Sequence, residues 1–314
     1  MLAYLLRRLF ATAVIVLVVG VVVFFLIRLV PGDVTSALLG QEASAEEIAA
    51  LRERLDLDRP VPLQFAAWLG GVLRGDLGTS SYMRVPVVEA IATRIEPTAM
   101  LALATTLVAV VMGVGLGVVA ATRAGTATDL LVMTIAMLGL SLPTFWLGLL
   151  MILLFAVELQ WLPAAGYVSI REAPLQTLRY LVMPAVALGF GQAAIIARMT
   201  RSSLLDALQE DFVRTARSKG LPERAVVLKH ALRNAILPVV TVIGLSIATL
   251  AGGVVVTETV FNIPGAGRLV IESVLRRDYP VLQGTVLMVA LVYAIVNLLV
   301  DLSFLALDPR VRYA

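Results

Sequence analysis

Long apolar runs dominate this chain and decide what it can fold into. The first extends from about residue 9 to residue 30, which exceeds the roughly 18–20 residues that a helix needs to cross a bilayer. Hydrophobic residues make up 60% of the 314 positions, and the mean hydropathy is +0.94. These values exclude an ordinary soluble domain. We therefore predict an all-α integral membrane protein.

The sequence contains six such runs, separated by stretches that carry charges, proline or glycine. Arg7 and Arg8 precede the first run, which is too long for the apolar part of a cleaved signal peptide and is expected to remain as a helix. We predict one transmembrane domain over residues 1–314, with spans at about 9–30, 98–121, 130–157, 180–197, 235–256 and 281–305.

Charge distribution gives the orientation of these spans. With six spans, the segments on one side hold 13 Lys/Arg and 6 Asp/Glu, and those on the other hold 12 and 15. Short loops and termini rich in Lys/Arg stay in the cytoplasm. The sequence thus predicts a multi-pass protein of the cell (plasma or inner) membrane with both termini in the cytoplasm.

The longest polar segment, residues 31–97, is predicted to form a helical layer on the outer face. Ser44 and Glu47 have capping-box spacing, so a helix is expected to follow them. A second amphipathic helix is expected at about 64–73. The alternative is a solvated loop that only connects two spans.

Two features inside the spans predict local geometry. Pro143 interrupts the third span, so a kink is expected near Ser141 and Leu142, either beside a cavity or for packing alone. Gly113 and Gly117 have the spacing that allows two helices to approach closely.

A charged stretch at residues 201–238 separates the fourth and fifth spans. Gly220 is placed to end a helix in a left-handed turn, and Pro222 is placed to begin the next. An apolar stripe on one short helix is expected from Leu204, Leu208, Phe212 and Ala216. This stretch either docks a separate soluble protein or lies at the membrane surface, with its cations on anionic headgroups.

Several chemistries find little support in the composition. The chain has no Cys and one His, His230, so metal sites and a Ser–His relay are not expected. Only 6% of residues are aromatic, and cytoplasmic Lys/Arg explain the basic charge, so nucleic acid is not an expected partner. No phosphate-binding GxxxxGK[ST] loop occurs, so ATP hydrolysis would need a partner.

Two further alternatives stay open at this point. Ser141 and Ser246 follow a Gly-x pattern seen in intramembrane serine proteases, although small residues for helix packing explain both strings. Asp301 is an acid within the sixth predicted span. It would serve an ion-coupled secondary carrier or channel, or be a hydrogen-bonded structural carboxylate.

Long strings of this sequence resemble the membrane-spanning permease subunits of ABC importers for dipeptides and oligopeptides. The cytoplasmic stretch TARSKGLPERAVVLKHALRNAILPVVTV carries the resemblance most clearly. Further agreement comes from LDLDRPVPLQFAAWL, LRGDLGTS, SLPTFWLGLLMILLFA, WLPAAGY, TETVFNIPGAGRLVIESVLRRDYPVLQG and NLLVDLSFLALDPRVRY. The resemblance therefore covers nearly the whole chain.

The resemblance implies a type I ABC importer permease fold with a helical extracytoplasmic segment between the first two spans. It implies a non-catalytic subunit without its own cofactor, paired with a homologous second permease. Two ABC ATPase subunits would bind ATP and Mg²⁺. An extracytoplasmic binding protein would deliver the peptide substrate to the permease pair, which would lie in the lipid bilayer. Permeases for nickel or glutathione-like compounds in the same family are the alternative.

The resemblance also assigns site residues. Gly220 corresponds to the glycine of the family's ATPase-contacting loop, whereas Arg214 stands where the wider superfamily commonly has an acid. The predicted ATPase-docking residues are Arg214, Thr215, Ala216, Arg217, Ser218, Lys219, Gly220, Leu221, Pro222, Glu223 and Arg224. From their place in the predicted outer loops, the candidate contacts for the binding protein are Glu258, Arg276, Arg277 and Asp278. The alternative is that they are solvated loop charges.

Overall fold

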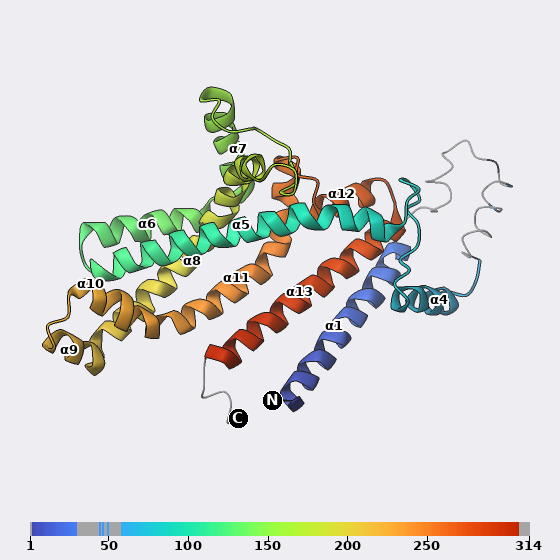
Figure 1. Cartoon of the computed structure of the whole chain (residues 1–314). Coiled ribbons are helices and arrows are strands. Elements are labelled where there is room, and N and C mark those ends of the chain that lie inside the picture. The colour runs from blue at the N-terminus through green and yellow to red at the C-terminus, as the bar shows by residue number, and fades with distance from the viewer. Residues whose placement is uncertain (1, 30–43, 45, 47–48, 50–57, 308–314) are drawn as a thin grey trace. The chain divides into compact units, whose positions relative to one another are not determined.

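The computed structural model describes residues 2–29, 44, 46, 49 and 58–307, and nearly all of them are helical (Figure 1). The chain forms two compact units. Unit 1 consists of residues 1–96 and 265–295, and unit 2 of residues 97–264 and 296–314. The helix expected after Ser44 and Glu47 lies largely outside the described residues, so it stays a prediction.

Unit 1 is built around a short apolar helix that packs against a membrane-length helix. Its helices are α1 (Leu2–Leu29), α4 (Val61–Leu73), the start of α5 (Val87–Thr122), α12 (Ala266–Leu275) and most of α13 (Tyr279–Leu307). The Phe24 ring lies 5.1 Å from Phe65 and 5.4 Å from Trp68, between centroids. This aromatic cluster holds α4 on α1, and α4 confirms the second helix predicted for the outer segment.

A small apolar core joins the remaining helices of unit 1. Val87, Ile91, Leu269 and Val281 are buried together. Gly284 lets α13 come so close to α5 that an added Cβ would lie 2.6 Å from Val87. The loop before α5 and the turn between α12 and α13 are thereby brought side by side.

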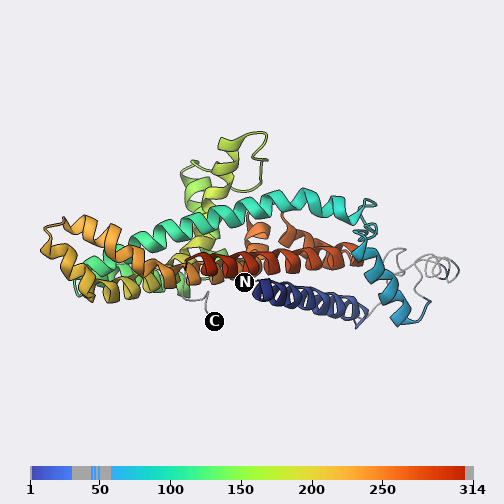
Figure 2. The same cartoon turned by 60° about the horizontal axis from the view of Figure 1, so that its bottom comes forward.

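Unit 2 is built around one long helix that packs against several others. Its elements are the rest of α5, α6 (Ala127–Ser141), α7 (Thr144–Met151), the π-helix η1 (Ile152–Glu158), α8 (Pro174–Gln209), α9 (Asp211–Ser218), α10 (Glu223–Ala225), the π-helix η2 (Val226–Ala231) and α11 (Leu232–Val260). Helix α8 packs against α6, α7 and α11, and the two views of the ribbon show it running through the middle of unit 2 (Figure 2).

Glycines bring α5 and α8 into close contact. A Cβ on Gly113 would lie 2.6 Å from Ile196 Cβ, and one on Gly117 would lie 2.5 Å from Thr200 Cβ. Both distances are too short for any real side chain, so only glycine fits there. The close approach predicted from the Gly113 and Gly117 spacing is confirmed.

Five described helices are long and apolar enough to cross a membrane, and α6 with α7–η1 makes a sixth if that bent pair counts as one span. The break falls at Leu142 and Pro143, as predicted, but the bend of 104° is far more than a proline kink. Helices α5 and α8 also extend well beyond the predicted spans, since α5 continues through Pro97 at its amino end and α8 continues through the polar residues after Ala197.

The α5–α8 contact predicts opposite effects for two neighbouring substitutions. Gly113→Ala should lower the free energy of unfolding by about 1–3 kcal/mol, because the methyl group has no room. Gly115→Ala should leave it unchanged or raise it, since nothing lies within 4 Å of its Cβ and alanine favours helix. Thermal unfolding in detergent distinguishes them, and equal behaviour of both variants would contradict the close packing.

Candidate functional site

The charged stretch folds into a helical elbow, defined here as α9, the turn at residues 219–222 and α10. Helix α8 ends at Gln209, and Glu210 is extended (φ −70°, ψ 151°). Gly220 then adopts φ +73°, and Pro222 precedes the first residue of α10. The left-handed turn at Gly220 and the helix start at Pro222 are both confirmed. The elbow lies at the end of unit 2 where α8 and α11 meet (Figure 1).

The apolar stripe predicted for one short helix is wrong. Leu204 and Leu208 belong to α8, whereas Phe212 and Ala216 belong to α9. The extended backbone at Glu210 separates the two helices and changes the register. Consequently Val213 is buried in place of Phe212, whose side chain is 39% exposed.

A core of small and medium apolar side chains lies beneath the elbow. It draws on five elements, and its buried members are Ala121, Leu204, Ala207, Val213, Ala216, Val226, Val227, Ala231 and Ala235. Four of them, Leu204, Val213, Val226 and Ala231, are fully buried. This elbow core fixes α9, and η2 directly after α10, to α5, α8 and α11, since separating them would expose apolar surface.

An ion pair closes the turn of the elbow. Arg217 Nη2 donates to Glu223 Oε1 at 2.7 Å, and Arg217 Nε donates to Glu223 Oε2 at 3.1 Å. These hydrogen bonds raise the pKa of Arg217 above its ordinary value, so the guanidinium stays charged. Two of the predicted docking residues therefore pair with each other across Gly220 and help to shape the turn.

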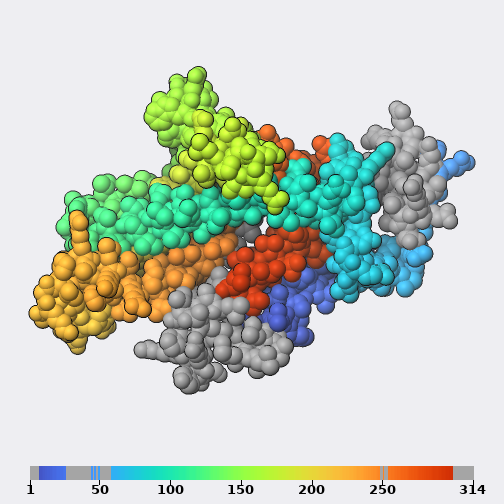
Figure 3. Space-filling model, viewed as in Figure 1, coloured from blue at the N-terminus to red at the C-terminus, as the bar shows by residue number. Residues whose placement is uncertain are grey.

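The other predicted docking residues divide by exposure. Ala216 is buried in the elbow core, so this residue packs the elbow and offers no surface to a partner in this structure. Arg214, Lys219 and Arg224 are exposed, and so are the remaining residues, Thr215, Ser218, Gly220, Leu221 and Pro222. The elbow surface thus combines cations with exposed apolar groups at a protruding end of unit 2 (Figure 3).

A second ion pair, which sequence reasoning missed, ties α6 to α8. Arg201 donates from Nε to Asp129 Oδ1 and from Nη2 to Asp129 Oδ2, both at 2.7 Å. The backbone N–H of Gly125 also donates to Oδ2, at 3.0 Å. The two residues are 72 positions apart. The signal in the sequence was an acid in the first turn of an apolar helix, directly before the third predicted span at about 130–157.

Two of the four predicted outer contacts are buried. Glu258 lies inside α11 and is 0% exposed, with Thr98 Oγ1 donating to its Oε1 at 2.5 Å. Asp278 is 2% exposed. A direct contact of either carboxylate with a partner is therefore not supported by this structure, because neither reaches the surface. Arg276 and Arg277 are exposed in the turn between α12 and α13.

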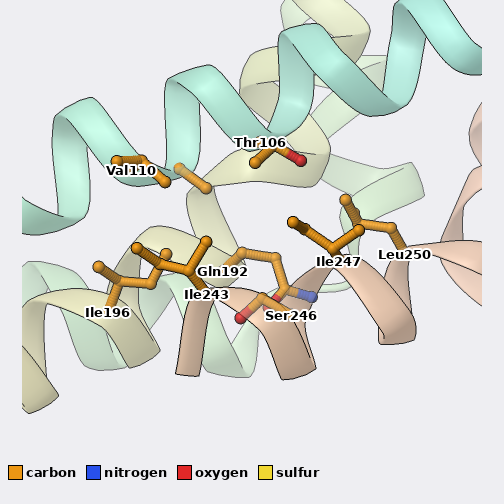
Figure 4. A pocket seen from close by; sticks show the side chains of 9 residues that line it. Thr106, Val110, Gln192, Ile196, Ile243, Ser246, Ile247 and Leu250 are labelled. Carbon is orange, nitrogen blue, oxygen red and sulfur yellow. The ribbon is translucent and has the colours of Figure 1, made fainter. Parts of the chain in front are cut away.

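Unit 2 contains a small cavity between α5, α8 and α11 (Figure 4). Thr106, Gln192 and Ser246 bring polar groups to a wall that is otherwise apolar. The volume is about 10 Å³, close to the least that one water molecule requires. Ser141 lies elsewhere, and its hydroxyl donates to the Met137 carbonyl of its own helix.

The described residues offer no metal site. Among the residues that the structure describes, no group of three or more His, Cys, Asp or Glu side chains could hold a metal ion. The side chain of Asp301 lies outside the described part of α13, so its role stays open.

Comparison with known families gives two matches that together cover most of the chain. Residues 113–313 match the family described as "Binding-protein-dependent transport system inner membrane component". Residues 1–102 match the model for the N-terminal part of such membrane components.

Individual relatives match over their full lengths. The chain is 43% identical over 310 residues to the "Probable peptide ABC transporter permease protein y4tP" of Sinorhizobium fredii, covering 99% of each chain. It is 45% identical over 313 residues to the "Glutathione transport system permease protein GsiC" of Pectobacterium atrosepticum, covering 100% of each.

A solved structure supports the fold. The chain is similar to a subunit of the MetNI methionine ABC transporter in an inward-facing conformation, with a TM-score of 0.57 and 20% identity. The similarity covers 70% of this chain and 97% of that one. The type I importer permease fold predicted from the sequence is thereby confirmed.

The Asp129–Arg201 pair predicts a selective loss of stability. Arg201→Ala should lower the unfolding temperature in detergent, because it leaves a mostly buried carboxylate without its cation. Arg198→Ala, which removes an exposed arginine one turn earlier on α8, is the matched control and should have little effect. Equal effects of the two substitutions would show that the pair does not hold α6 to α8.

Proposed function

The chain belongs to the family of binding-protein-dependent transport system inner membrane components, and from this premise we propose that it forms half of the translocation pathway of an ATP-driven importer for dipeptides and oligopeptides. A homologous second permease would supply the other half. This chain would contribute no catalysis, and ATP with Mg²⁺ would bind to two separate ABC ATPase subunits.

The substrate proposal draws on the relatives. One is named for peptides and another for glutathione, which is itself a small peptide-like molecule with amide bonds and carboxylates. Both match this chain over nearly its whole length at similar identity. We favour peptides as the substrate class and keep glutathione-like compounds as the second candidate within it.

The need for a second permease is supported by the small cavity of unit 2. The cavity between α5, α8 and α11 holds about 10 Å³, far below the several hundred Å³ typical of small-molecule sites. The larger hollows of unit 2, of about 200, 380 and 530 Å³, are more open to the surface of this chain, so none of them encloses a dipeptide. We propose that the substrate passes between this chain and its partner permease.

The elbow is the observation that carries the coupling proposal. Its exposed cations and apolar groups offer a surface to a soluble partner, while its buried side is fixed to α8 and α11 by the elbow core. We propose that both termini and the elbow face the cytoplasm, where the ATPases dock. A push on α9 would then move α8 and α11 together and change which side of the membrane has access to the pathway.

Substitution of Gly220 tests this proposal. Nothing lies within 4 Å of an added Cβ, so the effect would come only from φ +73°, which costs an ordinary residue roughly 1–2 kcal/mol. Gly220→Val should weaken ATPase docking about tenfold by shifting the turn. Gly220→Asn should have a much smaller effect, because asparagine tolerates this conformation.

Docking is best measured as association of the purified ATPase subunits with the permease pair in nanodiscs, together with substrate-stimulated ATP hydrolysis. Unchanged docking of the valine variant would contradict the proposal. Weakened attachment to anionic lipid, with ATPase docking unchanged, would show instead that the elbow is a membrane-surface segment.

A further inference from the structure

Asp278 is the centre of a hydrogen-bonded junction in unit 1. Ser80 Oγ donates to Asp278 Oδ2 at 2.5 Å. The backbone N–H of Ser81 donates to Oδ1 at 3.2 Å, and that of Tyr82 donates to Oδ2 at 3.3 Å. Ser80 Oγ in turn accepts from the N–H of Met83 at 2.8 Å. One buried carboxylate thus fixes the loop before α5 against the turn between α12 and α13.

Exposed cationic and aromatic side chains surround this junction. The Arg276 guanidinium lies 3.9 Å from the centre of the Tyr82 ring, a cation–π contact, and Tyr82 is 56% exposed. Arg277 directly precedes Asp278, and the N–H of Arg84 donates to the Ser80 carbonyl at 3.1 Å. We refer to Tyr82, Arg84, Arg276 and Arg277 as the arginine platform.

The backbone at two of these arginines is strained. Arg84 has φ +59° and Arg277 has φ +52°, a left-handed conformation that glycine or asparagine adopts at much lower cost. No hydrogen bond or ion pair of either guanidinium appears among the described residues. Strain of this kind is typical of functional positions. Among the described residues, no contact of either guanidinium offsets the cost of this backbone conformation.

We propose that the arginine platform is the docking surface for an acidic face of the soluble binding protein. This inference rests on the proposed function, since it presumes an importer that receives its substrate from such a protein. Asp278 is then a positioning residue, which holds the platform but does not touch the partner.

The chemistry of the platform favours a protein over a lipid surface. Guanidinium groups bind carboxylates through paired hydrogen bonds and are enriched, with tyrosine, at the centres of protein interfaces. A lipid headgroup needs only nearby positive charge. Strained turns held by a buried carboxylate would add nothing to lipid binding, whereas a rigid protein surface requires fixed positions.

Replacement of the strained arginines by glycine is predicted to act in opposite directions on stability and on docking of the binding protein. Arg84→Gly and Arg277→Gly remove a charge and relieve the backbone, so each should keep or raise the unfolding temperature while weakening docking about tenfold. Arg277→Glu should weaken docking further and reduce its dependence on salt. Arg59→Glu, which makes the same charge change at an exposed arginine before α4, should stay within about twofold of wild type.

The measurement is the affinity of the binding protein for the complete permease–ATPase complex in nanodiscs, at several salt concentrations. The probe is the binding protein that stimulates ATP hydrolysis by the wild-type complex. A stable glycine variant that binds the binding protein as tightly as wild type would overturn the inference. It would also be overturned if Arg277→Glu changed only the amount of anionic lipid retained by the complex.

The same samples separate this inference from the proposed function. ATPase association occurs at the elbow and does not involve the platform. If the ATPases associate normally and every platform variant binds the binding protein as wild type does, only the docking role of the arginine platform is overturned. A wild-type complex in which the ATPases do not associate would instead contradict the proposed coupling role.

Discussion

The apolar core beneath the elbow is the interaction on which the proposed mechanism depends. Val213 and Ala216 of α9 pack there with Leu204 of α8 and Val226 of η2. A surface ion pair such as Arg217–Glu223 contributes little by itself, but burial of these apolar groups cannot be undone without exposing them to water. A force applied to α9 is therefore passed to two membrane-length helices.

Other contacts extend this rigid attachment through unit 2. Gly113 and Gly117 place α5 directly against the backbone of α8, and the Asp129–Arg201 pair fixes the start of α6 to the same helix. Close-packed interiors transmit displacement instead of absorbing it. Helices α5, α6 and α8 are expected to move as one block when the elbow moves.

Features that depend on local chemistry could be predicted from the sequence. Apolar runs gave the spans, and glycine with proline gave the turn of the elbow, because backbone preference acts within a few residues. Burial of Glu258 and Asp278 could not be predicted, since hydropathy places acids in loops and ignores distant donors such as Ser80. The sharp bend at Pro143 exceeds a proline kink, because Leu142 directly before it is extended (φ −85°, ψ 129°) and separates α6 from α7.

Rigid attachment of the elbow is tested most directly by distances within the working complex. The chain has no cysteine, so a pair of introduced cysteines can carry spin labels at Ser202 on α8 and at Asp211 on α9, both exposed and outside the predicted docking residues. The distance distribution would be measured by pulsed electron resonance in ATP-free and ATP-bound complexes. An unchanged distribution is predicted, and a shifted or broadened distribution on ATP binding would contradict the account.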